Sequence, residues 1–317
     1  MKNNFATILF GVFILILFIN LSSADFSDWF GKFTGRATQQ DTNVSVALNG
    51  TRGVSVAVTN STLSSVSPTE NSNTVATFYV QVTDLDGVND INDTAVNVSF
   101  TKSGEVSRFN SSCSLTSDIS STTANYTCTV NIWYYDSTGA WVVNACGKDL
   151  GNTTYACNST QNFTYNQLQA LTLSPSSLTW ATLTPGTENQ TSNNDPTLIN
   201  NTGNFNFTNI TIRGHNLHGE VASSVLINVA NFSVGNNTGS SAECDLSPAT
   251  YNATRLTNGT DLQLKHTILT RGNHSVNTNA TGQEQLYYCL LTVPQVQTQT
   301  YSTTYTGGAW LIIGTTS

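Results

Sequence analysis

Hydrophobic and polar residues alternate with a period of two along much of the chain. In the segments 44–48 and 54–58, Val, Ala and Leu alternate with polar residues on either side of the turn-forming run 49–53. Such alternation is typical of β-strands with one buried face, and the two segments predict a hairpin. After residue 40, no stretch keeps helical spacing for three turns. The pattern therefore predicts an all-β fold.

Further short alternating segments, separated by turns rich in Gly, Asn and Asp, continue to the end of the chain. We expect strands at 77–82, 96–100, 126–135, 141–146, near Phe163, and at 178–180, 205–212, 225–234, 262–269, 286–293 and 310–313. The connections are too short for the crossover helices that parallel strands need. With 317 residues, the chain suits two domains. We therefore expect two antiparallel β-sandwich domains, at residues 41–167 and 168–317.

The first 24 residues have the pattern of an export signal. Lys2 precedes an apolar run from Phe5 to Ile19, and the small residues at 22–24 offer a cleavage site. The same run, extended to Leu21, reaches the lower length limit for a membrane-spanning helix. Residues 1–24 are therefore either a signal peptide or an N-terminal membrane anchor helix, and both alternatives predict export.

Residues 25–40 form an aromatic linker that bears on this choice. Its aromatic residues fall at i, i+3, i+4 and i+7, on one side of a helix: Phe26, Trp29, Phe30 and Phe33. This spacing favours a helix at the membrane interface. The alternative is a mature N-terminal segment that docks its aromatic side chains on the first domain.

Six cysteines in an exported chain indicate three disulfides. A domain break near residue 168 leaves two cysteines after it, which must pair with each other if bonds stay within domains, so three connectivities remain. Pairing between sequence neighbours favours Cys113–Cys128, Cys146–Cys157 and Cys244–Cys289.

Charged residues make up only 9% of the chain, and the net charge of −8 reflects a shortage of Lys and Arg. Without a basic stripe, nucleic acid is not an expected partner. Solubility must come from neutral polar groups, of which Asn, Ser and Thr are the commonest.

Asn-x-Ser/Thr sequons occur about twenty times after the leader, roughly twice as often as composition alone would give. In 95–100, Asn97 points away from the apolar residues 96, 98 and 100, so a glycan there would project into water. The alternative is that these Asn and Thr residues simply serve turns and strands. The expected acceptors are Asn43, Asn49, Asn60, Asn92, Asn97, Asn110, Asn125, Asn152, Asn158, Asn162, Asn189, Asn200, Asn206, Asn209, Asn231, Asn236, Asn252, Asn258, Asn273 and Asn279.

Three closely spaced carboxylates, Asp84, Asp86 and Asp90, surround Gly87. Calcium loops need oxygen ligands on a sharp turn, so calcium is a candidate ligand here. The segment lacks the full twelve-residue loop and its terminal Glu, and a tight turn between strands uses Asp and Gly for backbone reasons alone. No other cofactor is expected.

No catalytic motif is recognisable in the chain. His215 and His218 lie three residues apart, but the flanking glycines indicate a loop rather than the ordered element on which metal-binding pairs usually lie. Nucleophile elbows, phosphate loops and zinc-protease motifs are missing from the sequence. We therefore expect that the protein is not an enzyme.

The segment 133–141, with Trp at both ends, followed by 146–152, resembles the hairpin of PKD-like and other immunoglobulin-like modules of archaeal and bacterial surface proteins. The resemblance covers residues 74–165 and implies immunoglobulin-like sandwiches. Together with the aromatic segment 29–36, the chain resembles archaeal cell-surface glycoproteins. The stretch 178–204 resembles secreted sandwich domains of the camelysin type, some of which build extracellular fibres.

These features predict an extracellular, cell-surface structural or adhesive glycoprotein whose partners are cell-surface proteins or glycans. One alternative is a glycan-binding module that uses Trp133, Trp141 or Trp180 as stacking platforms, although such residues are more often core. Another is a self-associating subunit of a surface filament or lattice, joined by strand addition through the segment 310–313.

Overall fold

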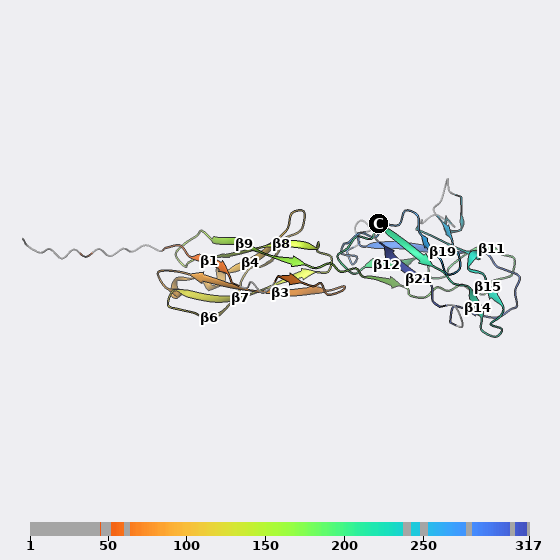
Figure 1. The fold of residues 1–317 in the computed structure, drawn as a ribbon, viewed down its shortest axis with the longest axis horizontal. Helices are drawn as coiled ribbons and strands as arrows, with labels where there is room; N and C mark the ends of the chain where they lie inside the picture. The colour runs from red at the N-terminus through yellow and green to blue at the C-terminus, as the bar shows by residue number, and fades with distance from the viewer. Residues whose placement is uncertain are drawn as a thin grey trace, which may run out of the picture. The chain divides into compact units, whose positions relative to one another are not determined.

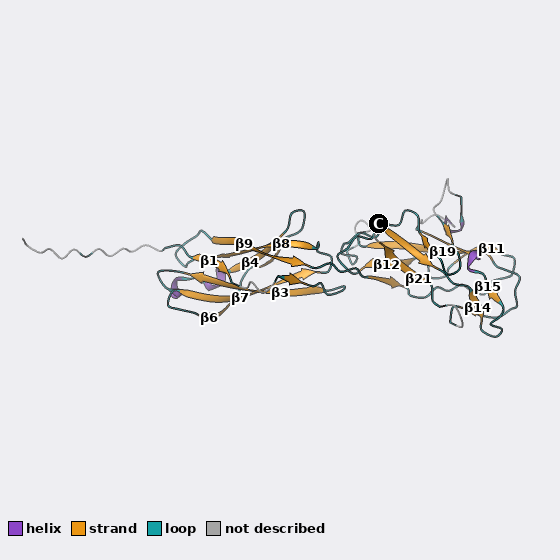
Figure 2. Cartoon of the chain, viewed as in Figure 1, coloured by secondary structure: helices purple, strands orange, loops and turns teal. Residues whose placement is uncertain are grey.

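The computed structural model describes Ser45 and the residues 52–59, 64–236, 242–247, 253–276, 281–304 and 308–315. Apart from Ser45, all of them belong to one compact unit, Thr51–Ser317. This described part is all-β, with strands and loops, a few short 3₁₀ turns and no α-helix (Figure 2). The leader 1–24, the aromatic linker 25–40 and most of the segment 44–48 lie outside the described residues.

The first hydrophobic core lies between two sheets (Figure 1). One sheet has the order β1 (Ser55–Val58), β3 (Asn73–Thr83), β7 (Thr123–Trp133) and β6 (Ser114–Asp118). The other has the order β2 (Ser65–Val66), β9 (Ala156–Tyr165), β8 (Gly139–Gly147), β4 (Asn97–Thr101) and β5 (Arg108–Asn110). All pairs are antiparallel except β2 with β9.

Alternation along the strands builds this core, because every second side chain points inward. On β3 and β7, Phe78 lies opposite Cys128, and both are buried. Phe78 meets Phe100 of β4 and Phe163 of β9 across the interior, with ring centroids 5.0 and 5.7 Å away. These edge and tilted contacts join the two sheets, and the result is the sandwich that the sequence predicted for this part of the chain.

The second core, from Ile199 to Val293, is formed by more and shorter strands. Its largest sheet has the order β10 (Leu171–Ser174), β12 (Thr197–Asn201), β19 (Gln283–Thr292), β16 (Phe232–Gly235) and β17 (Thr254–Arg255), and β11 (Glu188–Thr191) also pairs with β19. A three-stranded sheet has the order β18 (Asp261–Gln263), β13 (Asn209–Arg213) and β21 (Leu311–Thr315). Another three-stranded sheet has the order β15 (Leu226–Ile227), β14 (Leu217–Gly219) and β20 (Tyr301–Ser302).

Several predicted strands are wrong in detail. Residues 178–180 form a loop, in which the Trp180 ring packs edge-on against Phe232 at 5.3 Å. The predicted strand 225–234 is interrupted by the 3₁₀ turn Val229–Asn231, whose N-cap Asn228 accepts a hydrogen bond from the Ala230 N–H. In both places hydrophobic side chains reach the core without a continuous strand.

The predicted hairpin between 44–48 and 54–58 stays a prediction, because most of 44–48 lies outside the described residues. β1 pairs along its length with β3, Ser55 lying opposite Thr83 and Val58 opposite Val80. The alternation in 54–58 therefore predicts a strand correctly, and β3 is a neighbour that the pattern did not indicate.

Contacts between loops connect the two cores. Arg271 forms a two-pronged ion pair with Glu105 and donates a further hydrogen bond to the Tyr135 carbonyl oxygen at 2.9 Å. The backbone N–H of Asn71 donates to the carbonyl oxygen of Thr202 at 2.9 Å. Glu105 and Arg271 are both largely buried, which strengthens this charge pair relative to one in open solvent.

Candidate functional site

The aspartates that the sequence singled out lie together at one end of the first core. Ligand oxygens of Asp84, Asp86 and Asp90 lie within 4.8 Å of one another. Asp84 directly follows β3, and Asp90 ends the 3₁₀ turn η1 (Val88–Asp90). Gly87, between them, has φ of 123°, a conformation that glycine adopts without strain. The turn therefore folds the three carboxylates toward one point.

Two of these carboxylates, those of Asp84 and Asp86, each accept a backbone hydrogen bond with one oxygen. Asp84 is fully buried, and its Oδ1 accepts a hydrogen bond from the Asp86 N–H at 2.8 Å. Asp86 is exposed, and its Oδ2 accepts from the Arg52 N–H at 2.6 Å. The second oxygen of Asp84, Oδ2, is buried and has no hydrogen-bond partner among the described residues.

A fourth carboxylate, Asp149, was missed by the sequence analysis. It lies just after β8, and an isolated antiparallel bridge pairs it with Ile91, next to Asp90. The Leu150 N–H also donates to the Asp90 carbonyl oxygen at 2.7 Å. Asp149 is only 1% exposed, and neither of its carboxylate oxygens has a hydrogen-bond partner in the described part of the chain.

We call these four residues the acidic cluster: Asp84, Asp86, Asp90 and Asp149. The pKa of Asp90 is raised, first by loss of hydration and then by the negative charges of Asp84 and Asp149. No Lys or Arg of the described ranges forms an ion pair with a member of the cluster, since the three salt bridges there involve other acids. The cluster is thus a concentration of negative charge that no described Lys or Arg pairs with.

Each predicted glycan acceptor that the structure describes is at least partly exposed. Asn162, Asn189, Asn206 and Asn258 are exposed, and none of the other described sequon asparagines is buried. The two fully buried asparagines, Asn201 and Asn204, both lie outside sequons. Asn43, Asn49, Asn60, Asn252 and Asn279 lie outside the described residues.

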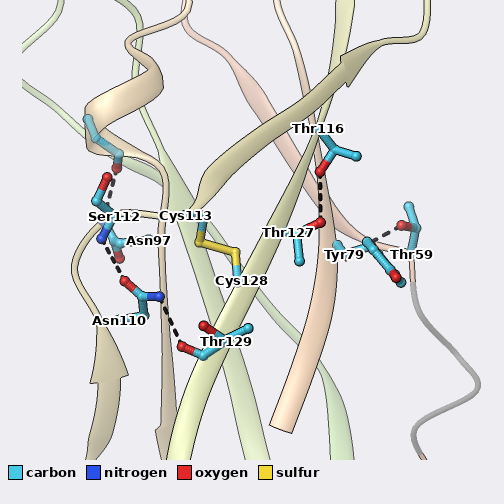
Figure 3. The surroundings of a disulfide bond; sticks show 11 residues. Thr59, Tyr79, Asn97, Asn110, Ser112, Cys113, Thr116, Thr127, Cys128 and Thr129 are labelled. Carbon is cyan, nitrogen blue, oxygen red and sulfur yellow. Dashed lines mark hydrogen bonds between the residues drawn. A yellow bond between two sulfur atoms is a disulfide. The ribbon is translucent and has the colours of Figure 1, made fainter. Parts of the chain in front are cut away.

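Several sequons adopt a common local geometry, in which the backbone N–H two residues on donates to the Asn side chain. Figure 3 shows this at Asn110, beside the disulfide between Cys113 and Cys128: its Oδ1 accepts from the Ser112 N–H at 3.0 Å, and its Nδ2 donates to the Thr129 carbonyl oxygen at 2.9 Å. The same turn holds Asn152, Asn158 and Asn273. In such turns the Asn side chain takes the place of a backbone carbonyl and fixes the local turn.

The three expected disulfides are present, with the pairing of sequence neighbours confirmed: Cys113–Cys128, Cys146–Cys157 and Cys244–Cys289. The first joins the start of β6 to β7, and the second joins the paired strands β8 and β9. The third attaches the turn η4 (Ala242–Cys244) to β19. Three such bonds suggest folding in an oxidising compartment.

The tryptophans considered as glycan platforms differ in accessibility. Trp141 is fully buried and donates from Nε1 to the Ser137 carbonyl oxygen at 2.8 Å, so it belongs to the core. Trp180 is half-buried against the second core, and its Nε1 donates to the Gln190 carbonyl oxygen. Trp133 is also half-buried, and its ring stacks on Tyr135 with centroids 5.9 Å apart.

A hollow of about 440 Å³, lined by Arg108, Asp136, Glu105 and Arg271 among others, lies by the contacts between the cores. The charged side chains that line it form ion pairs with one another, Arg108 with Asp136 and Arg271 with Glu105. On β14, His218 Nδ1 lies 2.8 Å from the Ser223 carbonyl oxygen. His218 and His215 belong to no group of three metal-ligating side chains among the described residues.

In the part of the chain that the structure describes, no helix has the length and apolar character needed to cross a membrane. No protein-family model matches the sequence, and no curated protein matches it.

Proposed function

We propose that the protein is an extracellular, cell-surface glycoprotein with a structural or adhesive, non-catalytic role. It consists of two immunoglobulin-like sandwich domains, one around each core, which an N-terminal signal or anchor segment delivers to the surface. Its partners are cell-surface proteins or glycans.

The distribution of asparagines carries this proposal. Sequon asparagines of the described residues are at least partly exposed, whereas the buried Asn201 and Asn204 are outside sequons. A glycan needs water around its attachment point, so this separation is what glycosylation requires. Asn125 also lies on the outer side of β7, close to the exposed Tyr79 of β3. A glycan there would cover an otherwise uncharged sheet face.

Mass spectrometry of protein purified from the cells that make it tests the glycans. Asn162-Phe163-Thr164 offers a matched pair of variants, because Thr164 is exposed. We expect Thr164→Ala to remove one glycan mass and Thr164→Ser to retain it. A native mass equal to that of the bare polypeptide would refute glycosylation.

A glycan-binding role is the second candidate, and the stacked pair of Trp133 and Tyr135 is the observation that favours it. Aromatic faces of this kind stack on sugars. We expect Trp133→Ala to abolish any hit in a glycan-array screen; binding that persists in this variant would locate the site elsewhere.

Strand addition by the C-terminal segment has less support, because β21 pairs with β13 of the same chain from Asn209 to Arg213. Negative-stain imaging of cell surfaces labelled for the protein separates the remaining roles. Fibres or a lattice would favour a filament subunit, and diffuse label would favour an adhesin.

A further inference from the structure

We propose that Asp84, Asp86 and Asp90 of the acidic cluster bind one calcium ion at the end of the first core, and that the buried charge of Asp149 beside them strengthens the binding. Ligand oxygens of the first three lie within 4.8 Å of one another, whereas Asp149 is not part of that group and comes from the connection after β8. This proposal does not depend on the glycoprotein role.

The unpartnered oxygens are the first argument. Asp84 and Asp149 are 0% and 1% exposed, and together they leave three buried carboxylate oxygens without a hydrogen-bond partner. An ionised carboxylate that is removed from water costs several kcal/mol unless it is paired or ligates a metal. Among the described residues, no cation of the protein is paired with either of them.

A structural turn explains only part of the arrangement. The turn uses Asp84 Oδ1 and Asp86 Oδ2 as acceptors of backbone N–H groups. It uses neither Asp84 Oδ2 nor either oxygen of Asp149, which belongs to another connection. Backbone requirements alone therefore do not place a buried aspartate at position 149.

The ligand chemistry points to calcium. All the groups are carboxylate oxygens, without the nitrogen or sulfur ligands that zinc and other transition metals prefer. Calcium accepts six to eight oxygens in irregular geometry, whereas magnesium demands a near-ideal octahedron and loses its water reluctantly. Three carboxylates on one irregular turn suit the more adaptable ion.

A bound ion would join two stretches of chain. Its three ligands lie in the connection from β3 to β4, and Asp86 also accepts a hydrogen bond from the backbone of Arg52. Calcium would therefore brace this end of the first core by offsetting the repulsion among its carboxylates.

The test is thermal unfolding of the full-length protein in EDTA and with calcium added to about 10 mM, since extracellular modules bind calcium with dissociation constants of about 10⁻⁴ to 10⁻³ M. We expect calcium to raise the melting temperature of the first core by roughly 3 to 10 °C. Magnesium, and sodium chloride at matched ionic strength, should raise it much less. Calorimetric titration should give one ion per chain.

Isosteric variants locate the site. Asp86→Asn and Asp90→Asn should abolish the calcium shift, Asp149→Asn should weaken it, and Asp118→Asn, which removes the same charge from exposed β6, should retain it. In EDTA, Asp149→Asn should melt at or above the wild-type temperature, because it removes an uncompensated buried charge.

Three results would overturn the proposal. The first is an unchanged calcium shift in Asp86→Asn or Asp90→Asn, and the second is an equal shift with sodium chloride, which would indicate screening alone. The third is a large loss of stability of Asp149→Asn in EDTA, since a purely structural aspartate would behave in that way.

Discussion

Asp195 offers the clearest test of the electrostatics of the second core. Its Oδ2 accepts a hydrogen bond from the Tyr288 N–H at 3.0 Å, and its Oδ1 is buried without a partner among the described residues. Burial, opposed by the Tyr288 hydrogen bond and reinforced by the charge of Glu243, raises the pKa of Asp195 to about 6. Glu243 is itself buried, and its pKa is raised for the same reason.

A raised pKa means that the folded state holds the proton more tightly than the unfolded chain. Asp195 therefore contributes stability that is fully present below about pH 4 and is lost as the pH rises through about 6. Raising the pKa from 3.8 to about 6 corresponds to an upper limit of about 3 kcal/mol. Because Asp195 is only partly buried, solvent screens part of this, and we expect about 1 to 2 kcal/mol.

The assay is urea unfolding of the wild type and of Asp195→Asn at intervals from pH 4 to pH 8. The free energy of unfolding of the wild type relative to the variant should fall by about 1 to 2 kcal/mol over this range. An amide at this position carries a constant, pH-independent cost from its own burial, so only the change with pH is informative.

Asp261→Asn serves as the control. Hydrogen bonds from Arg213 lower the pKa of Asp261, so its contribution is fully present above about pH 4, and the difference between wild type and this variant should stay flat from pH 4 to pH 8. A difference between wild type and Asp195→Asn that stays flat from pH 4 to pH 8 would refute the reasoning, because it would mean that Asp195 titrates normally.

Two further predictions concern the cores. Replacing Cys244 and Cys289 by Ser should destabilise the second core by about 4 kcal/mol, because the bond closes a separation of 45 residues; calorimetry that gives the same melting temperature for variant and wild type would contradict this. Trp141→Phe should lower the free energy of unfolding, measured with a chemical denaturant, by about 2 to 3 kcal/mol, because it leaves a cavity and removes the donor to the Ser137 carbonyl oxygen. Trp133→Phe, at a half-buried position, should cost less than about 1 kcal/mol, and equal losses in the two variants would contradict the burial assigned to them.

Sequence pattern predicted the strands that bury one face and missed those that bury none. β7 alternates buried Tyr126, Cys128 and Val130 with outward polar residues, so its period of two is readable. β6 (Ser114–Asp118) is exposed along its whole length as an edge strand, and no alternation could mark it. Loop 178–180 shows the opposite error, because apolar side chains docked on a core resemble a short strand.

The candidate site shows the same limit at the level of single residues. Asp84, Asp86 and Asp90 are neighbours in sequence, so their spacing around Gly87 was enough to find them. Asp149 reaches the cluster only through an isolated bridge to Ile91, and the register of such a bridge cannot be read from local pattern. The Cys-bearing strand before Asp149 was visible, but nothing in the sequence indicates that the aspartate is buried.

The two groups of buried acids should respond to different ligands. Asp195 leaves a single oxygen without a partner and has a backbone donor from Tyr288, so one proton is enough to relieve it. Asp149 leaves both oxygens without a partner beside three other carboxylates, and one proton cannot neutralise that group. Calcium should therefore leave the pH dependence of Asp195 unchanged while it raises the stability of the first core. If calcium shifted both cores equally, the ion would be acting on the chain in general and not at the acidic cluster.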